Sequence, residues 1–213
     1  PDWIHPHGRI HRDGTCHIEV LSMEQIAEIA GTLIGIAYLY WEYKADDKVW
    51  LAGMLMPAIS LVVYWQSGLY ADFGINVYYL LVAVYGLYLW RRNPQGGPAE
   101  ALPITHTPLA RCPFLLLAFL VSFLLIGWLL CRTDSTVPWW DAFTTALSIV
   151  GMWMLARKWL EQWWVWIVVD VVCVGLYIYK GLYFTSGLYA LYSVIAVFGW
   201  LNWKRLMKAS SVS

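Results

Sequence analysis

Seven apolar runs, each long enough to cross a lipid bilayer, constrain this chain more than any other feature. A membrane-spanning helix needs about 17–25 predominantly apolar residues. The runs are continuously apolar and lack the alternation typical of a membrane β-barrel, so we expect helices and no strands. They cover Met23–Trp41, Lys48–Gln66, Leu69–Trp90, Cys112–Cys131, Trp139–Ala156, Gln162–Lys180 and Ser186–Lys204.

The composition supports a membrane protein and argues against several other classes. Hydrophobic residues make up 60% of the chain and charged residues 13%, whereas soluble domains are about half apolar and a quarter charged. Lys+Arg and Asp+Glu both number 14, so no net positive charge is present to hold nucleic acid. None of the short motifs of zinc proteases, serine hydrolases or phosphate loops occurs, so we expect neither an enzyme nor a cofactor.

The segment that precedes Met23 is polar and carries four of the five histidines. The spacing of these histidines and of Cys16 fits no closed zinc site, so we expect no metal here. We expect residues 1–22 to form a disordered tail, or one foreign to the natural protein.

The basic residues are divided unequally between the two sides of the membrane. With seven spans, one side carries Arg9, Arg12, Arg132 and Lys180, and the other carries the remaining ten Lys and Arg residues. Because the side richer in Lys and Arg faces the cytoplasm, we expect the N-terminus outside and the C-terminus inside.

The sequence matches itself without a gap when it is shifted so that Trp50 falls on Trp163. This match predicts two three-helix units of the same orientation, residues 23–92 and 139–206, joined by a loop and a linking helix over 93–138. A cytoplasmic tail, 207–213, follows. Such parallel repeats are typical of sugar-efflux transporters, and transporter substrates bind at the interface between repeats. The other matched pairs include Tyr64 with Tyr177, Gly68-Leu69-Tyr70 with Gly181-Leu182-Tyr183, Gly86 with Gly199, and Trp90 with Trp203.

One ionisable residue lies near the middle of a predicted span. Asp170 follows Trp163 and Trp166 at helical spacings, so all three share one face of Gln162–Lys180. A charged residue in mid-bilayer costs about 2.5–3.5 kcal/mol to insert, which makes Asp170 a candidate for function. Aromatic rings beside a carboxylate suit an organic cation, although belt tryptophans and a helix-pairing aspartate would also fit.

Other polar side chains extend this candidate substrate site. Asn76 and Tyr79 share a face of the third span, and Asn76 can both donate and accept hydrogen bonds. Thr145 and Ser148 share a face of the fifth span, where such hydroxyl groups also often bind their own backbone. Gln66 ends the second span at its outer surface.

Three stretches of the sequence resemble the PnuC family of bacterial nicotinamide riboside transporters. They are Gln66–Tyr70, Tyr85–Trp90 and Trp139–Trp166, and the likeness extends over about 24–208. The third stretch is the most specific. It matches the family at Trp140, Asp141, Leu147, Ser148, Arg157, Lys158, Glu161, Gln162, Trp163 and Trp166.

The resemblance implies a 3+1+3 fold in the bacterial inner membrane, assembled as a homotrimer. It implies facilitated diffusion of the vitamin and trapping of the product by a cytoplasmic vitamin kinase. The ligand-binding amides and tryptophans of the family fall on Gln66, Asn76, Trp163 and Trp166 of this sequence.

The resemblance leaves the substrate open between two cationic vitamins. Many riboside carriers of this family have asparagine where this chain has Asp170, and the segment Gly74–Tyr79 is similar to that of relatives assigned to thiamine. We expect nicotinamide riboside, with thiamine as the alternative. A vitamin-binding receptor without transport, a membrane enzyme, and proton coupling through Asp170 are weaker alternatives.

Overall fold

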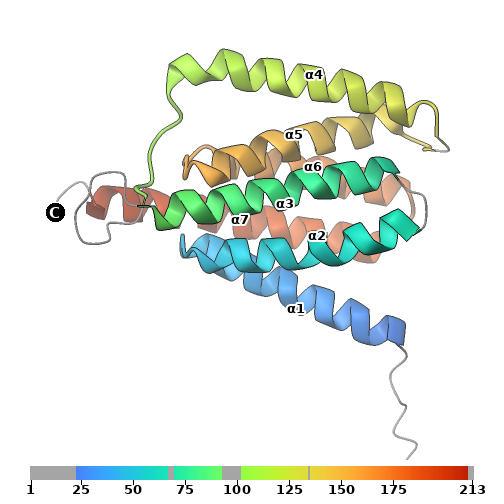
Figure 1. Ribbon diagram of the computed structural model, residues 1–213, viewed down its shortest axis with the longest axis horizontal. Helices are drawn as coiled ribbons and strands as arrows, with labels where there is room; N and C mark the ends of the chain where they lie inside the picture. The colour runs from blue at the N-terminus through green and yellow to red at the C-terminus, as the bar shows by residue number, and fades with distance from the viewer. Residues whose placement is uncertain (1–22, 67–69, 93–101, 134, 211–213) are drawn as a thin grey trace, which may run out of the picture.

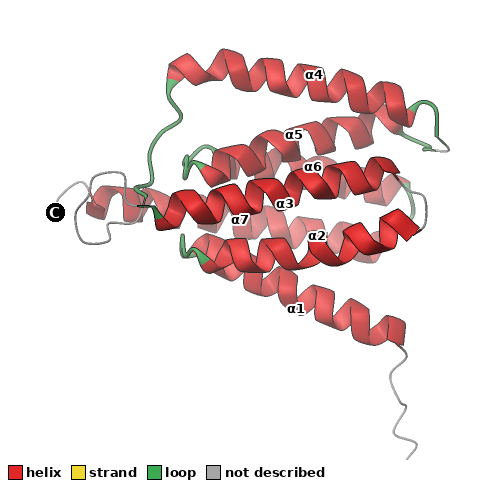
Figure 2. Cartoon of the chain, viewed as in Figure 1, coloured by secondary structure: helices red, strands yellow, loops and turns green. Residues whose placement is uncertain are grey.

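The structure, a computed structural model, describes residues 23–66, 70–92, 102–133 and 135–210. The predicted tail over 1–22 and residues 93–101 of the predicted linker loop lie outside these residues. The described residues form helices and connecting loops and contain no strand (Figures 1 and 2). The helices are α1 Met23–Tyr43, α2 Lys48–Gln66, α3 Tyr70–Arg91, the short η1 Leu109–Arg111, α4 Cys112–Leu130, α5 Pro138–Ala156, α6 Gln162–Tyr179 and α7 Tyr183–Ser210. The predicted all-helical class is confirmed.

Five segments are long and apolar enough to cross a membrane. They are Lys48–Gln66, Phe73–Arg91, Leu109–Leu130, Gln162–Tyr179 and Tyr183–Ser210. Over the described residues, α1 and α5 do not reach this limit, although both are about as long as the others. Both helices carry polar side chains, among them Glu42 in α1 and Asp141 in α5, which lower their mean hydropathy. The predicted number of seven spans therefore stays a prediction.

Six of the helices form a closed ring. Going round the ring, α1 packs on α2, α2 on α3, α3 on α5, α5 on α6, α6 on α7, and α7 on α1. Among the described elements α4 packs only on α5 and η1, and it lies outside the ring at the top of Figure 1. This arrangement leaves a space between the helices in which a ligand can lie.

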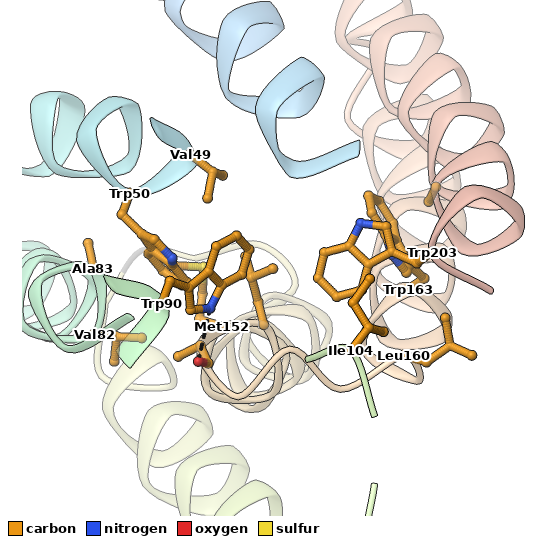
Figure 3. Packing of buried hydrophobic residues seen from close by; sticks show 13 residues of the cluster. Val49, Trp50, Val82, Ala83, Trp90, Ile104, Met152, Leu160, Trp163 and Trp203 are labelled. Atoms are coloured by element: carbon orange, nitrogen blue, oxygen red, sulfur yellow. Dashed lines mark hydrogen bonds between the residues drawn. The ribbon is translucent and has the colours of Figure 1, made fainter. Parts of the chain in front are cut away.

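Two tryptophan pairs lie in the core at positions that the internal sequence match aligns with each other (Figure 3). Trp50 meets Trp90 edge-on with ring centroids 5.4 Å apart, and Trp163 meets Trp203 edge-on at 5.6 Å. A Cβ atom on Gly86 would overlap the Trp50 ring, and one on Gly199 would overlap the Trp163 ring. These four tryptophans are therefore core residues, which accounts for part of the high tryptophan content.

The α1–α2 and α5–α6 turns have the same backbone conformation at the same offset. The two non-glycine residues of positive φ in the described chain occupy equivalent places, Ala45 at 54° and Lys158 at 52°. The amides of Ala45 and Lys158 donate to the equivalent carbonyl groups of Glu42 and Leu155. A left-handed residue of this kind ends each helix and reverses the chain.

Candidate functional site

A cavity of about 1120 Å³ lies between the helices of the ring and extends to α4. Ligand sites in proteins commonly have volumes of about 300–1,000 Å³, so the space suffices for a vitamin-sized molecule. Most of the lining is aliphatic or aromatic. The lining comes from α1, α3, α4, α5, α6 and α7, and its polar residues are Tyr38, Glu42, Tyr78, Tyr79, Ser122, Asp141, Thr144, Thr145, Ser148, Trp163, Trp166, Asp170, Cys173, Tyr177, Tyr189 and Tyr192.

The charged groups of the lining are all acidic. They are Glu42, Asp141 and Asp170, and no Lys or Arg among the described residues lines the cavity. Asp141 is already neutralised, because Lys180 Nζ lies 3.0 Å from its carboxylate and the Ser135 hydroxyl donates to it at 3.0 Å. The remaining two carboxyl groups give the cavity a negative character that suits a cation.

Asp170 occupies the middle of α6 and faces the cavity. Its side chain is only 7% exposed, and no hydrogen bond or ion pair joins it to another described residue. A buried carboxylate without a partner is strongly destabilising, unless a proton or a bound cation neutralises its charge. The prediction that Asp170 faces inward beside aromatic rings agrees with this placement.

The two predicted stacking tryptophans differ in their surroundings. Trp163 is 1% exposed, and its ring is held between Gly199 and Trp203. Trp166 is only partly buried and lies beside Gly151. The indole N–H of each ring has no hydrogen-bond partner among the described residues. Both line the cavity, but the geometry favours Trp166 as a stacking surface and Trp163 as a wall of the core.

The hydroxyl groups predicted for the site also reach the cavity. Tyr79 lines it from α3, and Thr145 and Ser148 line it from α5. The Thr145 hydroxyl donates to the Asp141 carbonyl at 2.7 Å, and the Ser148 hydroxyl donates to the Thr144 carbonyl at 2.9 Å. Because each hydroxyl group already donates its hydrogen to a backbone carbonyl of α5, it can only accept a hydrogen bond from a ligand.

Two predicted residues lie away from the cavity lining. Gln66 is exposed at the end of α2, and Asn76 is half-buried on α3 beside the lining residues Ile75 and Tyr78. The structure therefore brings six of the eight predicted residues together around one space. Asn76 and Gln66 are not among those six.

Two polar residues at the end of the cavity where α1 ends and α6 begins were not predicted to belong to the site. Glu42, in the last turn of α1, is 2% exposed and lines the cavity. Gln162, the first residue of α6, is fully buried, and its amide lies beside the Glu42 carboxyl group. Glu42 immediately precedes a charged turn, so the sequence pattern placed it in the loop.

The link between α3 and α4 docks on the α5–α6 turn, outside the apolar helices. Thr105 donates its amide to the Lys158 carbonyl and accepts from the Leu160 amide. Glu161 accepts from the Thr107 amide at 2.7 Å and from the Thr107 hydroxyl at 2.8 Å, and His106 Nδ1 lies 2.6 Å from its other oxygen. Burial opposes ionisation, but these hydrogen bonds hold the pKa of Glu161 below its usual value.

Lys158 is buried in the same turn. Only 4% of the residue is exposed, and its Nζ atom lies 4.2 Å from the centroid of the Trp90 ring. Burial lowers the pKa of Lys158 to about 8, against the opposing effect of Asp47 and Asp46. Among the described residues, no group of three or more His, Cys, Asp or Glu side chains could hold a metal ion.

The chain is similar to known transport proteins over most of its length. It is 27% identical to the nicotinamide riboside transporter PnuC of Escherichia coli (strain K12), over 84% of this chain and 85% of that protein. It is 24% identical to the riboflavin/roseoflavin transporter RibM of Streptomyces davaonensis, over 83% of this chain and 84% of that protein.

A solved structure supports the fold. The crystal structure of the vitamin B3 transporter PnuC superposes with a TM-score of 0.62 at 23% identity, covering 84% of this chain and 80% of that one. With several membrane-crossing helices, this is a multi-pass protein of the bacterial inner membrane. Residues 25–205 match the family described as nicotinamide mononucleotide transporters, and the chain belongs to that family.

Proposed function

We propose that this protein carries a cationic vitamin, nicotinamide riboside, across the inner membrane by facilitated diffusion. The substrate binds in the cavity between the helices of the ring. The single observation that carries the proposal is Asp170, a buried carboxyl group that faces the cavity without a protein partner. Trp166 stacks on the pyridinium ring, and Asp170 balances its charge. Tyr79, Thr145 and Ser148 meet the polar groups of the ribose.

The charge of the cavity favours the riboside over the other substrates named for this family and its members. The mononucleotide carries a phosphate group, which the carboxyl groups of Glu42 and Asp170 repel. Riboflavin has no fixed positive charge, so a buried, unpaired Asp170 offers it no advantage. Only a cation uses the one unpaired charge in the middle of the lining.

Thiamine is the second candidate, because its thiazolium ring is also a fixed aromatic cation and Asp170 suits either. Titrating the purified protein with each vitamin, with quenching of its 15 tryptophans as the signal, separates the two. Saturable quenching by thiamine alone would move the assignment to thiamine and leave the site unchanged.

We further propose that residues 23–92 and 139–206 are parallel repeats, joined through α4, in a seven-span protein with its N-terminus outside. The equal geometry of the two tryptophan pairs and of the two turns supports this arrangement. Alternating access then comes from movement of one unit against the other. No enzymatic step is required.

Assembly and trapping complete the proposal. We propose a homotrimer, for which the apolar outer surface of α4 offers contact area, including Phe114, Leu117 and Leu124. We propose that a cytoplasmic kinase phosphorylates the vitamin. The product then carries negative charge, which the acidic cavity rejects, so the vitamin cannot leave by the same route.

The test is uptake of labelled nicotinamide riboside by proteoliposomes that contain unlabelled riboside. Wild-type protein should exchange the label, and Asp170→Ala should reduce the rate at least tenfold at equal protein content. Asp46→Ala, in a partly exposed turn, serves as the matched control and should exchange normally. Binding without exchange would indicate a receptor, and normal exchange by Asp170→Ala would remove Asp170 from the mechanism.

A further inference from the structure

The backbone around Glu42 is fixed by α7. The Trp203 indole N–H donates to the Glu42 carbonyl at 2.8 Å, and the Asn202 amide donates to the Tyr43 carbonyl at 2.8 Å. The Glu42 side chain therefore projects from a fixed point at the end of the cavity where α1 ends and α6 begins. A group held in this way is preorganised for binding.

The polar atoms at this point have no well-formed hydrogen bond. Oε1 of Glu42 and both amide atoms of Gln162 are buried without one among the described residues, and the Glu42 carboxyl group has only the adjacent Gln162 amide for polar contact. Leaving several buried polar atoms without hydrogen bonds destabilises the folded protein. A ligand that enters the cavity with a positive charge and hydroxyl groups would satisfy these atoms.

The other half of the chain shows that the fold does not need polar residues here. In the internal sequence match, Leu155 stands in place of Glu42 and Val49 in place of Gln162. Leu155 and Val49 are both fully buried in the apolar core. Apolar side chains therefore fill the equivalent places, and polar ones occur where a cavity adjoins.

We propose that Glu42, together with Gln162, forms a second cation subsite that receives the substrate's charged ring on its way from Asp170 to the inner side. This inference rests on the proposed function. Gln162 begins α6 and Asp170 lies eight residues further along it, so the two subsites follow one another along the cavity. The Glu42 and Asp170 carboxyl groups are close enough to interact electrostatically.

The test compares nicotinamide riboside with its 1,4-dihydro form, which has nearly the same shape but no positive charge. Exchange of each is measured in proteoliposomes for wild type, Glu42→Gln, Glu42→Asp and the control Asp46→Asn. We expect Glu42→Gln to slow exchange of the cation about tenfold or more, since one counter-charge is lost. We expect it to leave exchange of the neutral form within about twofold of wild type. Glu42→Asp should retain most of the rate for the cation.

Each other outcome contradicts the subsite. Unchanged exchange of the cation by Glu42→Gln would overturn it, and so would an equal loss for both forms, because that pattern indicates a structural role. Failure of Glu42→Gln to fold while Glu42→Asp exchanges slowly would overturn it too. A wild-type protein that moves neither nicotinamide riboside nor thiamine would overturn the proposed function itself. If thiamine alone is moved, the variants are compared with thiamine, and an unaffected Glu42→Gln rejects the subsite while the transport proposal stands.

Discussion

The α1–α2 and α5–α6 turns share one backbone conformation but have different surroundings. The first is partly exposed, and its acidic residues form surface ion pairs: Asp47 with Arg91 at 2.6 Å and Asp46 with Lys48 at 3.8 Å. The second has Trp159 and Leu160 in the equivalent places, and both are buried. The backbone of the turn is thus compatible with either environment, and the side chains decide whether a neighbouring segment covers it.

The covering segment explains why α4 lies on one side of the molecule. Thr105 and Thr107, which precede α4, bind the α5–α6 turn through Lys158, Leu160 and Glu161. The α1–α2 turn offers solvated carboxylates instead, and no described residue of the linker binds it. As a result α4 packs on α5 and has no contact with α1.

The largest loss of stability should come from substituting Gly86 or Gly199, two glycines that pack against tryptophan rings. In Gly86→Ala or Gly199→Ala the new methyl group would overlap a tryptophan ring, and such overpacking costs about 1–3 kcal/mol. The gain in helix propensity, about 1 kcal/mol at most, offsets only part of this cost. The thermal midpoints of the two purified variants should both fall, and the two decreases should be similar to each other. A variant as stable as wild type would show that the two pairs are packed less tightly than described.

Next in size are the indole hydrogen bonds. The Trp90 N–H donates to the Ala156 carbonyl at 3.1 Å, and the Trp203 N–H donates to the Glu42 carbonyl at 2.8 Å. Trp90→Phe and Trp203→Phe should each lower the free energy of unfolding by about 1–2 kcal/mol. Only Trp203→Phe should also weaken binding of nicotinamide riboside, measured by titration, because it releases the Glu42 backbone. Equal binding by both variants would contradict that link.

Substituting the acidic residues of the two turns should cause smaller losses of stability, and the two losses should differ. Glu161→Gln weakens three contacts to the linker and should cost about 1 kcal/mol, since Glu161 is partly exposed and screened. Asp47→Asn should cost less than about 0.5 kcal/mol, as for a surface ion pair. Thermal midpoints at pH 7 measure both. An equal loss would show that the docked linker adds no stability.

The difference in stability between wild type and Glu161→Gln should depend on pH. The pKa of Glu161 is lowered in the folded protein, so its contribution is complete above its usual value of 4.5 and is lost as the pH falls through the folded value. The difference between wild type and Glu161→Gln should therefore persist from pH 7 to about pH 5 and shrink in more acidic solution. A difference that grows on acidification would assign the effect to another group.

The smallest effect concerns the residues of positive φ. Ala45→Gly relieves the left-handed backbone and should raise the free energy of unfolding by about 0.5 kcal/mol. Lys158→Gly relieves the same strain but removes a buried side chain that lies on the Trp90 ring, so it should lower stability. Thermal midpoints that move in the same direction would contradict the assigned role of Lys158.

The helices and the middle of the site could be predicted from the sequence. Long apolar runs leave little choice but helices, and helical spacing placed Asp170 and Trp166 on one face, where the structure has them lining the cavity. The ends of the helices were less predictable. Glu42 is a carboxylate in the last turn of an apolar run, and only tertiary packing shows that it is buried rather than solvated.

Helix rotation and core packing limited the remaining predictions. The face of α3 toward the cavity contains Gly74, Ile75, Tyr78 and Tyr79. Asn76 follows Ile75 in the sequence but does not line the cavity. Apolar composition on all sides of α3 gave no signal for that rotation. The role of Trp163 depends on Gly199, which belongs to a different helix, so spacing within α6 could not reveal that its ring is enclosed.

The indole hydrogen bonds also connect the two groups of helices reciprocally. Trp90, from the first three helices, bonds to α5, and Trp203, from the last three, bonds to α1. Asn202 adds a third bond to α1 at the same end of the molecule. These hydrogen bonds hold the two groups of helices together at the end of the ring where Glu42 lies. Any motion that opens that end must first break them.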